Sequence, residues 1–202
     1  MLISFEGIDN SGKTTQIAML DKYLHGKQIE TLILREPGGT EVSEHIRNIL
    51  LMPNRNIHPI AELLLFAAAR RELVEKLIKP ALNRGKVVVC DRYYDSTTAY
   101  QGWGRGIPMK EVQYCNEIAT SGIKPDITFY LDIPLEISKE RHNGRNADRM
   151  EASGDEFFTK VIDGFRSIAA SEPERIITID GSLPAESIHA IIVKNLEEFS
   201  NK

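Results

Sequence analysis

The sequence predicts an α/β fold, in which helices cover both faces of a doubly wound, five-stranded parallel sheet. Short apolar runs, rich in β-branched and aromatic residues, alternate along the chain with longer amphipathic segments. Runs that are apolar throughout are typical of parallel strands, because helices bury both of their sides. Alternation of strand and helix favours right-handed βαβ units. We expect a single domain over residues 1–202.

The predicted elements follow one another closely. Prolines at positions 108, 134 and 184 lie just before helical patterns, where a fixed φ suits the first turn. The expected strands are Leu2–Phe5, Thr31–Leu34, Val87–Cys90, Ile127–Leu131 and Ile176–Ile179. The expected helices are Lys13–His25, Glu41–Leu51, Ile60–Asn83, Lys110–Ser121, Leu135–His142, Asp155–Ala170 and Ala185–Phe199. The segment 143–154, rich in turn residues and bearing arginines, predicts a short mobile lid between two helices.

Composition excludes several classes of protein. The 29 acidic residues outnumber the 25 Lys and Arg, and a net charge of −4 argues against a nucleic-acid partner. The first residues do not form a secretory signal, and no apolar stretch approaches the roughly 18 residues that span a bilayer. Cys90 and Cys115 have no metal-binding spacing. We expect a cytoplasmic protein with no membrane partner.

The strongest motif lies directly after the first predicted strand. Residues 7–14, GIDNSGKT, match the P-loop pattern GxxxxGK[ST], and a helix is expected to follow. Glycines allow successive backbone N–H groups to turn inward around phosphate oxygens at a helix N-terminus. We expect the nucleotide phosphates to contact Gly7, Ile8, Asp9, Asn10, Ser11, Gly12, Lys13 and Thr14. A chance glycine-rich turn is the alternative, and the flanking strand and helix disfavour it.

The residues after the third predicted strand indicate which P-loop class applies. Asp91 can hold Mg²⁺, directly or through water, together with the Thr14 hydroxyl. Arg92 follows it, where a water-activating ATPase would usually have glutamate, and the chain lacks the NKxD motif of GTPases. A cation at the carboxyl end of a strand suits a second anionic substrate and phosphoryl transfer. The alternative is a surface ion pair at the strand end.

Four segments together resemble the thymidylate kinases (dTMP kinases), in the bacterial arrangement with arginines in the lid. They are VCDRYYDSTTAYQ at 89–101, REPGGT at 35–40, LFAAAR at 65–70 and QGWGRG at 101–106. The resemblance covers nearly the whole chain in the same order. It implies a P-loop NTPase-type fold and ATP-dependent phosphorylation of dTMP to dTDP with Mg²⁺, by a homodimer.

The resemblance also implies residues that recognise the acceptor. Phe66 and Arg70 share a helix face, and they would stack on thymine and donate to its carbonyl. Without the resemblance, core packing would be the preferred interpretation of Phe66. Thr97 and Gln101 would lie near the thymine N3 edge, on a helix capped by Asp95 or Ser96. Tyr100 would lie against the sugar C2′ and exclude ribose.

The same resemblance implies the catalytic groups. Arg47 and Arg92 would clamp the dTMP phosphate, with Asp9 and Glu36 positioning the acceptor. The catalytic residues would be Lys13, Asp9, Arg92 and the lid arginines Arg145 and Arg149. Asn10 occupies the P-loop position that carries an arginine in the other arrangement of the family. Arg141 is expected in the preceding helix, paired with Glu136 or Glu140.

Two other functions remain open from the residues alone. One is a different nucleoside-monophosphate kinase, which would share the P-loop and lid but not a preference for thymine. The other is a nucleotide-binding regulatory or scaffold protein without transferase activity.

Overall fold

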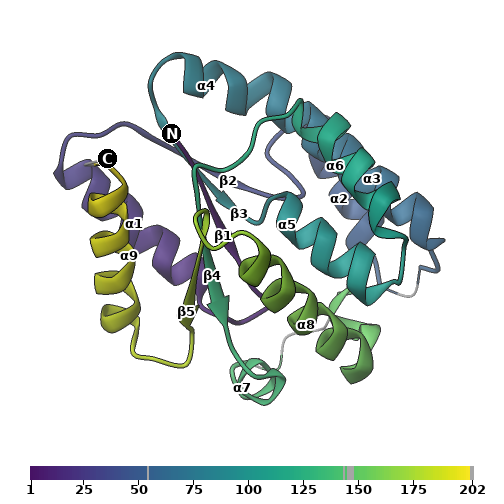
Figure 1. The fold of residues 1–202 in the computed structure, drawn as a ribbon. Coiled ribbons are helices and arrows are strands. Elements are labelled where there is room, and N and C mark those ends of the chain that lie inside the picture. Colours follow the sequence, from purple (N-terminus) through teal and green to yellow (C-terminus); the bar gives the residue numbers. More distant parts are fainter. Residues whose placement is uncertain (54, 143, 145–147, 201–202) are drawn as a thin grey trace.

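Five parallel strands form the centre of the protein, in the order β2-β3-β1-β4-β5 (Figure 1). The computed structural model describes residues 1–53, 55–142, 144 and 148–200. The strands are β1 (Leu2–Glu6), β2 (Thr31–Arg35), β3 (Val87–Asp91), β4 (Ile127–Asp132) and β5 (Ile176–Asp180). The α/β prediction and all the predicted strands are confirmed. Each strand continues past its predicted end to one charged residue, because the parallel ladder extends to the carboxyl edge of the sheet.

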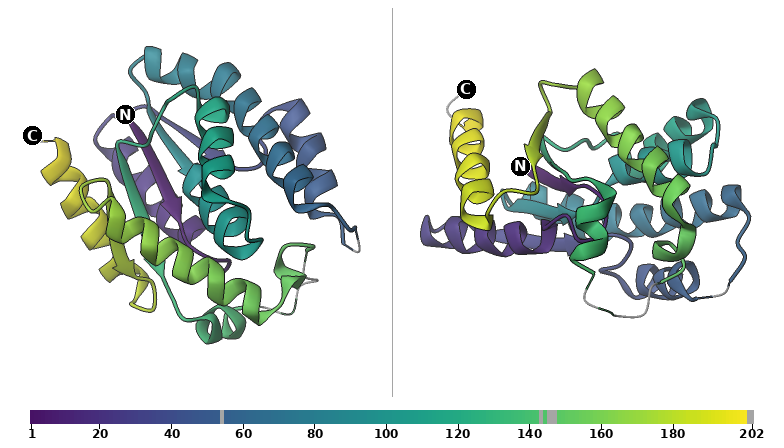
Figure 2. Two further views of the ribbon diagram at one scale, coloured as in Figure 1. Left: turned by 45° about the vertical axis from the view of Figure 1, so that its right-hand side comes forward. Right: turned by 90° about the horizontal axis from the view of Figure 1, so that it is seen from below.

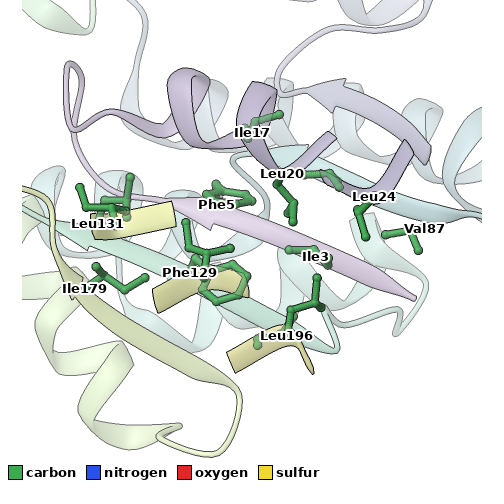
Figure 3. Packing of buried hydrophobic residues seen from close by; sticks show 14 residues of the cluster. Ile3, Phe5, Ile17, Leu20, Leu24, Val87, Phe129, Leu131, Ile179 and Leu196 are labelled. Atoms are coloured by element: carbon green, nitrogen blue, oxygen red, sulfur yellow. The ribbon is translucent and has the colours of Figure 1, made fainter. Parts of the chain in front are cut away.

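Two helices, α1 (Lys13–Gly26) and α9 (Ala185–Ser200), cover one face of the sheet. Ile17, Leu20 and Leu24 of α1 meet Ile3 and Phe5 of β1 in a cluster of buried side chains (Figure 3). Alternate residues of β1 point to opposite faces, so Leu2 belongs to a different cluster. Both predicted helices are thus explained by the apolar side chains they bury on the sheet.

The other face carries α8 (Asp155–Ser171) and the segment that follows β3, with a further layer of helices outside them (Figure 2). That segment is α5 (Tyr94–Thr97) continued by a π-helix, η2 (Thr98–Gly104). The outer helices are α2 (Glu41–Leu51), α3 (Pro59–Leu73) and α6 (Met109–Thr120). Two short elements, α7 (Leu135–Glu140) and the 3₁₀ turn η3 (Glu151–Ser153), precede α8.

The predicted helix over Ile60–Asn83 is confirmed, but its second half is not a regular α-helix. After α3 the chain passes through a π-helix, η1 (Val74–Ile78), before α4 (Lys79–Asn83). Pro80 has no N–H group for the carbonyl of Lys76 four residues earlier, and its ring would crowd that carbonyl. A π-helical turn relieves this crowding without ending the helix.

The expected cap of the helix after β3 is also wrong. The helix starts at Tyr94, after Tyr93, and no side-chain cap is present among the described residues. Asp95 is buried and forms an ion pair with Arg175, with Nη1 to Oδ2 at 2.7 Å. Its carboxylate therefore ties α5 to the start of β5 instead of closing the helix end.

Among the described residues, no helix is long and apolar enough to cross a membrane. Both cysteines are free thiols, and Cys90 is buried in the core.

Candidate functional site

The loop between β1 and α1, residues 7–14, forms a cradle at the carboxyl edge of the sheet. Gly7 has φ 135°, and a Cβ there would lie 2.6 Å from the carbonyl oxygen of Leu131. Gly12 has φ 101° and is the N-cap residue of α1. Both positions require glycine, because side chains are strained at these angles. The cradle opens into a cavity of about 710 Å³, which Asn10, Ser11, Gly12, Lys13 and Thr14 help to line.

Lys13 points its ammonium group back into this cradle. Nζ donates to the carbonyl oxygens of Gly7 and Ile8, at 3.1 and 2.9 Å. Burial, and then the nearby Arg92 guanidinium, lower the pKa of Lys13 to about 8. A desolvated cation on a loop of inward-turning backbone is suited to phosphate oxygens, whose charge would favour its protonated form.

Two hard oxygen donors meet beside the cradle. The Thr14 hydroxyl donates to Asp91 Oδ2 at 3.3 Å. A hydroxyl and one carboxylate are the ligands that suit Mg²⁺ when phosphate oxygens and waters complete its shell. Within the described part of the chain, no group of three His, Cys, Asp or Glu side chains could hold a metal alone. Thr14 and Asp91 therefore fit a magnesium ion that a bound nucleotide helps to hold.

Arg92 connects the cradle with the segment after β3. Its Nη1 donates to the Gly7 carbonyl at 2.7 Å, and its Nη2 lies 2.8 Å from Asp9 Oδ1. The Tyr100 hydroxyl donates to the other oxygen of Asp9 at 3.4 Å. Arg92 has φ 72°, a left-handed conformation that is uncommon outside glycine and clusters at functional sites. Asp9, Arg92 and Tyr100 are thus brought together as the sequence predicts.

A second cavity, the inner pocket, continues from Arg92 between α3 and η2. It has a volume of about 100 Å³ and holds the predicted recognition residues Glu36, Phe66, Arg70, Thr97, Tyr100 and Gln101. Phe66 is half-buried at the pocket wall, so it is not a core residue. The arrangement offers one aromatic face and several hydrogen-bonding groups to a flat ligand.

Arg70 is the most constrained cation of the inner pocket. Its side chain is 2% exposed, and Nε lies 2.6 Å from Glu36 Oε2. Nη1 donates to Thr97 Oγ1 at 2.9 Å, and Nη2 donates to the Tyr93 carbonyl at 3.1 Å. Burial raises the pKa of Glu36, while the Arg70 charge opposes the rise. Glu36 Oε1 is buried and has no hydrogen-bond partner among the described residues, so it can accept from a ligand.

Four predicted residues remain, and each lies in a different setting. Arg47 lines both cavities, and its Nη1 donates to the Pro37 carbonyl at 2.9 Å. The Asn10 amide donates to the Ser138 carbonyl at 3.1 Å, which ties the cradle to α7. Arg145 lies outside the described residues. Arg149 is held by Glu62, with Nη1 to Oε2 at 2.6 Å, and its Nε donates to the Leu50 carbonyl at 2.6 Å. This places Arg149 beyond the inner pocket, so its predicted catalytic role stays a prediction.

Arg141 lies at the end of the helix before the lid, as expected, but the expected pairing with Glu136 or Glu140 is wrong. Its Nη1 donates to the Gly181 carbonyl at 3.0 Å and to the Asn10 carbonyl at 3.4 Å. The side chain also lines the cavity of about 710 Å³ at the cradle, called the phosphate cavity below. Because Arg141 is the residue that caps α7, its side chain leaves the helix toward the loops. The helical spacing to Glu136 could not reveal this contact between distant loops.

Glu6 is a further residue that the sequence analysis missed. It ends β1 behind the cradle, where Oε1 accepts from Tyr93 N–H at 2.7 Å and Oε2 lies 2.5 Å from Ser96 Oγ. Burial, and then the nearby Asp95 charge, raise the pKa of Glu6 to about 8. Glu6 therefore holds the start of α5 as a mainly neutral carboxylic acid at pH 7.

We expect Glu6→Gln to fold and to change how stability depends on pH. In the folded protein Glu6 binds its proton up to about pH 8, whereas the usual value is 4.5. The free energy of unfolding of the wild type should therefore fall as pH rises from about 5 to 8, and the neutral glutamine should flatten this fall. Urea unfolding at pH 5, 6, 7 and 8 measures it. Equal pH slopes for the two proteins would contradict the expectation.

Comparisons with known proteins agree with this geometry. A family model described as thymidylate kinase matches residues 5–192. A thymidylate kinase of Prosthecochloris aestuarii is 50% identical over 97% of this chain and 92% of its own length. One of Caldanaerobacter subterraneus is 46% identical over 98% and 95%. The crystal structure of thymidylate kinase from Ehrlichia chaffeensis superposes with a TM-score of 0.79, at 38% identity over 97% of this chain and 98% of that one.

Proposed function

Since the chain belongs to the thymidylate kinase family, we propose that the two joined cavities are where it phosphorylates dTMP. The family transfers the γ-phosphoryl group of ATP to dTMP and releases dTDP and ADP, and this chain is a kinase of that kind. ATP is its co-substrate. The proposal concerns which residues of this chain bind the two nucleotides and which assist the transfer.

One observation carries the proposal: the phosphate cavity and the inner pocket share a wall. Both are lined by Asp9, Glu36, Arg47, Arg92 and Asp148. A monophosphate whose base lies in the inner pocket would therefore direct its phosphate toward the cradle. Alignment of donor and acceptor is the main requirement of phosphoryl transfer, because the reaction needs little covalent assistance.

In this proposal the cradle binds the ATP phosphates through the backbone of residues 7–14. Lys13 offsets the charge on the transferred group, and Arg47 and Arg92 hold the acceptor phosphate. Asp9 orients Arg92 through the 2.8 Å ion pair. Thr14 and Asp91 would hold Mg²⁺, directly or through water, and the ion would supply positive charge against the charge that develops during transfer.

The inner pocket would take the thymine base. Phe66 offers a face for stacking, Arg70 offers N–H donors, and Thr97 and Gln101 lie along the same wall. Tyr100 is fixed by Asp9 and by contacts with Phe157 and Phe165, which would keep its ring against the sugar. We extend the proposal to one domain over residues 1–202, a lid over 143–154 that includes Arg145 and Arg149, a homodimer and a cytoplasmic location.

A coupled assay of ADP release tests the proposal on purified protein with ATP and Mg²⁺. We expect kcat/KM for dTMP to exceed that for CMP and AMP by at least about 100-fold. The bases of CMP and AMP lack the donors and acceptors of thymine, so they would leave buried polar groups of the inner pocket unpaired. Comparable turnover of all three would favour a kinase without thymine selectivity. Binding of ATP with no transfer to any monophosphate would favour a nucleotide-binding regulator.

A further inference from the structure

A buried cluster beyond the inner pocket is centred on Glu62, in the first turn of α3. The Glu62 side chain is 1% exposed and accepts hydrogen bonds from three side chains. Gln101 Nε2 lies 2.8 Å from Oε1, and Arg105 Nε lies 3.1 Å from the same oxygen. Arg149 Nη1 lies 2.6 Å from Oε2. One carboxylate therefore joins α3 to Gln101 of the π-helix η2, to Arg105 just after it, and to Arg149.

The chemistry of this cluster fixes which way the Gln101 amide faces. An ionised carboxylate can only accept hydrogen bonds, and two guanidinium groups keep Glu62 ionised. Gln101 must therefore turn its NH₂ group toward Glu62, which leaves its carbonyl oxygen on the other side of the amide. Gln101 is buried and lines the inner pocket, so the pocket wall at this point presents a hydrogen-bond acceptor.

We propose that Glu62 is a positioning residue for nucleobase selection, acting through the orientation of the Gln101 amide. The inference rests on the proposed function, in which the inner pocket takes the base. An acceptor in the wall pairs with the ring N–H of thymine or uracil. Cytosine presents an unprotonated ring nitrogen at the same place, and this nitrogen is itself an acceptor. The Gln101 oxygen would then face another acceptor, so the orientation that Glu62 imposes on Gln101 disfavours cytosine.

Replacement of Glu62 by glutamine predicts a specific rearrangement. The new amide has one oxygen and one NH₂ group for the two former carboxylate positions. The oxygen is favoured at the Oε2 position, because an NH₂ group there would face two guanidinium nitrogens, Arg149 Nη1 at 2.6 Å and Arg105 Nη2 at 3.3 Å. At the Oε1 position an NH₂ group faces only one, Arg105 Nε at 3.1 Å, and its other neighbour, Gln101, can flip. The NH₂ group then faces Gln101, which must flip to offer its own oxygen. The flipped Gln101 presents its NH₂ group to the pocket and matches cytosine in place of thymine.

The experiment measures kcat/KM of the wild type and of Glu62→Gln with dTMP, dUMP and dCMP. We expect the dCMP/dTMP ratio of Glu62→Gln to rise at least about tenfold, since each mismatched polar contact in a buried site has a large effect. The dUMP/dTMP ratio should stay within about twofold, because both bases have the same ring N–H. A general loosening of the pocket would change both ratios.

Two further variants separate positioning from stability. Arg105→Met removes one cation from Glu62 but leaves the contact with Gln101, so it should lower the melting temperature without raising the dCMP/dTMP ratio. In a Gln101→Ala background, Glu62→Gln should no longer change the ratio, because its effect passes through Gln101. If Glu62→Gln alone fails to fold, the double change Glu62→Gln with Arg105→Met removes an anion and a cation together, and should show the same rise.

The outcomes distinguish this inference from the proposed function. A wild type that does not prefer dTMP would overturn the function, whatever the variants do. A wild type that prefers dTMP, with an unchanged dCMP/dTMP ratio in folded Glu62→Gln, would overturn the inference alone. A rise that persists in the Gln101→Ala background would also overturn it, because Glu62 would then act by another route.

Discussion

Lys13→Ala is expected to lower kcat for dTMP phosphorylation by about 10²–10³-fold or more, which is the loss seen when one preorganised group that stabilises transition-state charge is removed. Lys13 is 6% exposed, and its ammonium group donates to the carbonyls of Gly7 and Ile8, inside the cradle. Its charge is therefore held at the loop that the proposal assigns to the ATP phosphates. Single-turnover transfer from ATP to dTMP measures the chemical step directly.

The stability of the same variant separates a role in transfer from a role in folding. The pKa of Lys13 is about 8 in the folded protein, below its usual 10.5. Burial of the charged form therefore opposes folding at pH 7, and the opposition fades only as pH rises from 8 toward 10.5. Lys13→Ala should keep or raise the melting temperature at pH 7. Lys22→Ala, on the exposed side of α1, is the matched control and should leave both activity and stability unchanged. Lost activity with a lower melting temperature would contradict the assignment.

The sheet could be predicted because each strand has a signal in its own local sequence, a short continuous apolar run. The Val87–Cys90 run is buried on both faces, so all of its side chains are apolar, and a run of this kind is typical of a parallel strand. The two π-helices could not be predicted in the same way. In η2, the i to i+5 bond from Arg105 N–H to the Tyr100 carbonyl shifts every later side chain around the helix axis. No local propensity distinguishes that bond from an ordinary helical one.

The residues of the candidate site likewise divide into those with a local sequence signal and those without one. Lys13 and Arg92 were predictable, because glycine spacing and the end of a strand place them at one edge of the sheet. The resemblance added Phe66, Arg70 and Gln101, which sequence spacing alone would leave as core or surface residues. Neither the spacing of residues nor the resemblance predicted the contacts of Glu6, Glu62 and Arg141. Each acts through contacts between elements distant in sequence, such as the 39 positions that separate Glu62 from Gln101.

Arg70→Met should affect dTMP recognition and folding together. The change removes the N–H donors of the inner pocket, so we expect KM for dTMP to rise by about 10–100-fold. It also leaves the Glu36 carboxylate buried without its cation, 2.6 Å from the former guanidinium nitrogen. Breaking a buried pair by removing one partner typically lowers the free energy of unfolding by about 3–5 kcal/mol. Urea unfolding and steady-state kinetics measure the two effects on one preparation.

The dependence of that loss on pH identifies Glu36 as its cause. Burial already raises the pKa of Glu36, and Arg70 is the charge that opposes the rise, so its removal should raise the pKa further. The folded variant then binds a proton that the unfolded chain has lost, and its stability should fall as pH rises above about 4.5.

Adding Glu36→Gln should recover much of the stability but not the KM, because the buried charge is gone and the donors are still missing. The exposed neighbour Arg71, changed to Met as the matched control, should alter stability by less than about 1 kcal/mol. A double variant that recovers KM, or an Arg70→Met loss that does not change with pH, would show that Arg70 acts by packing and not through its charge on Glu36.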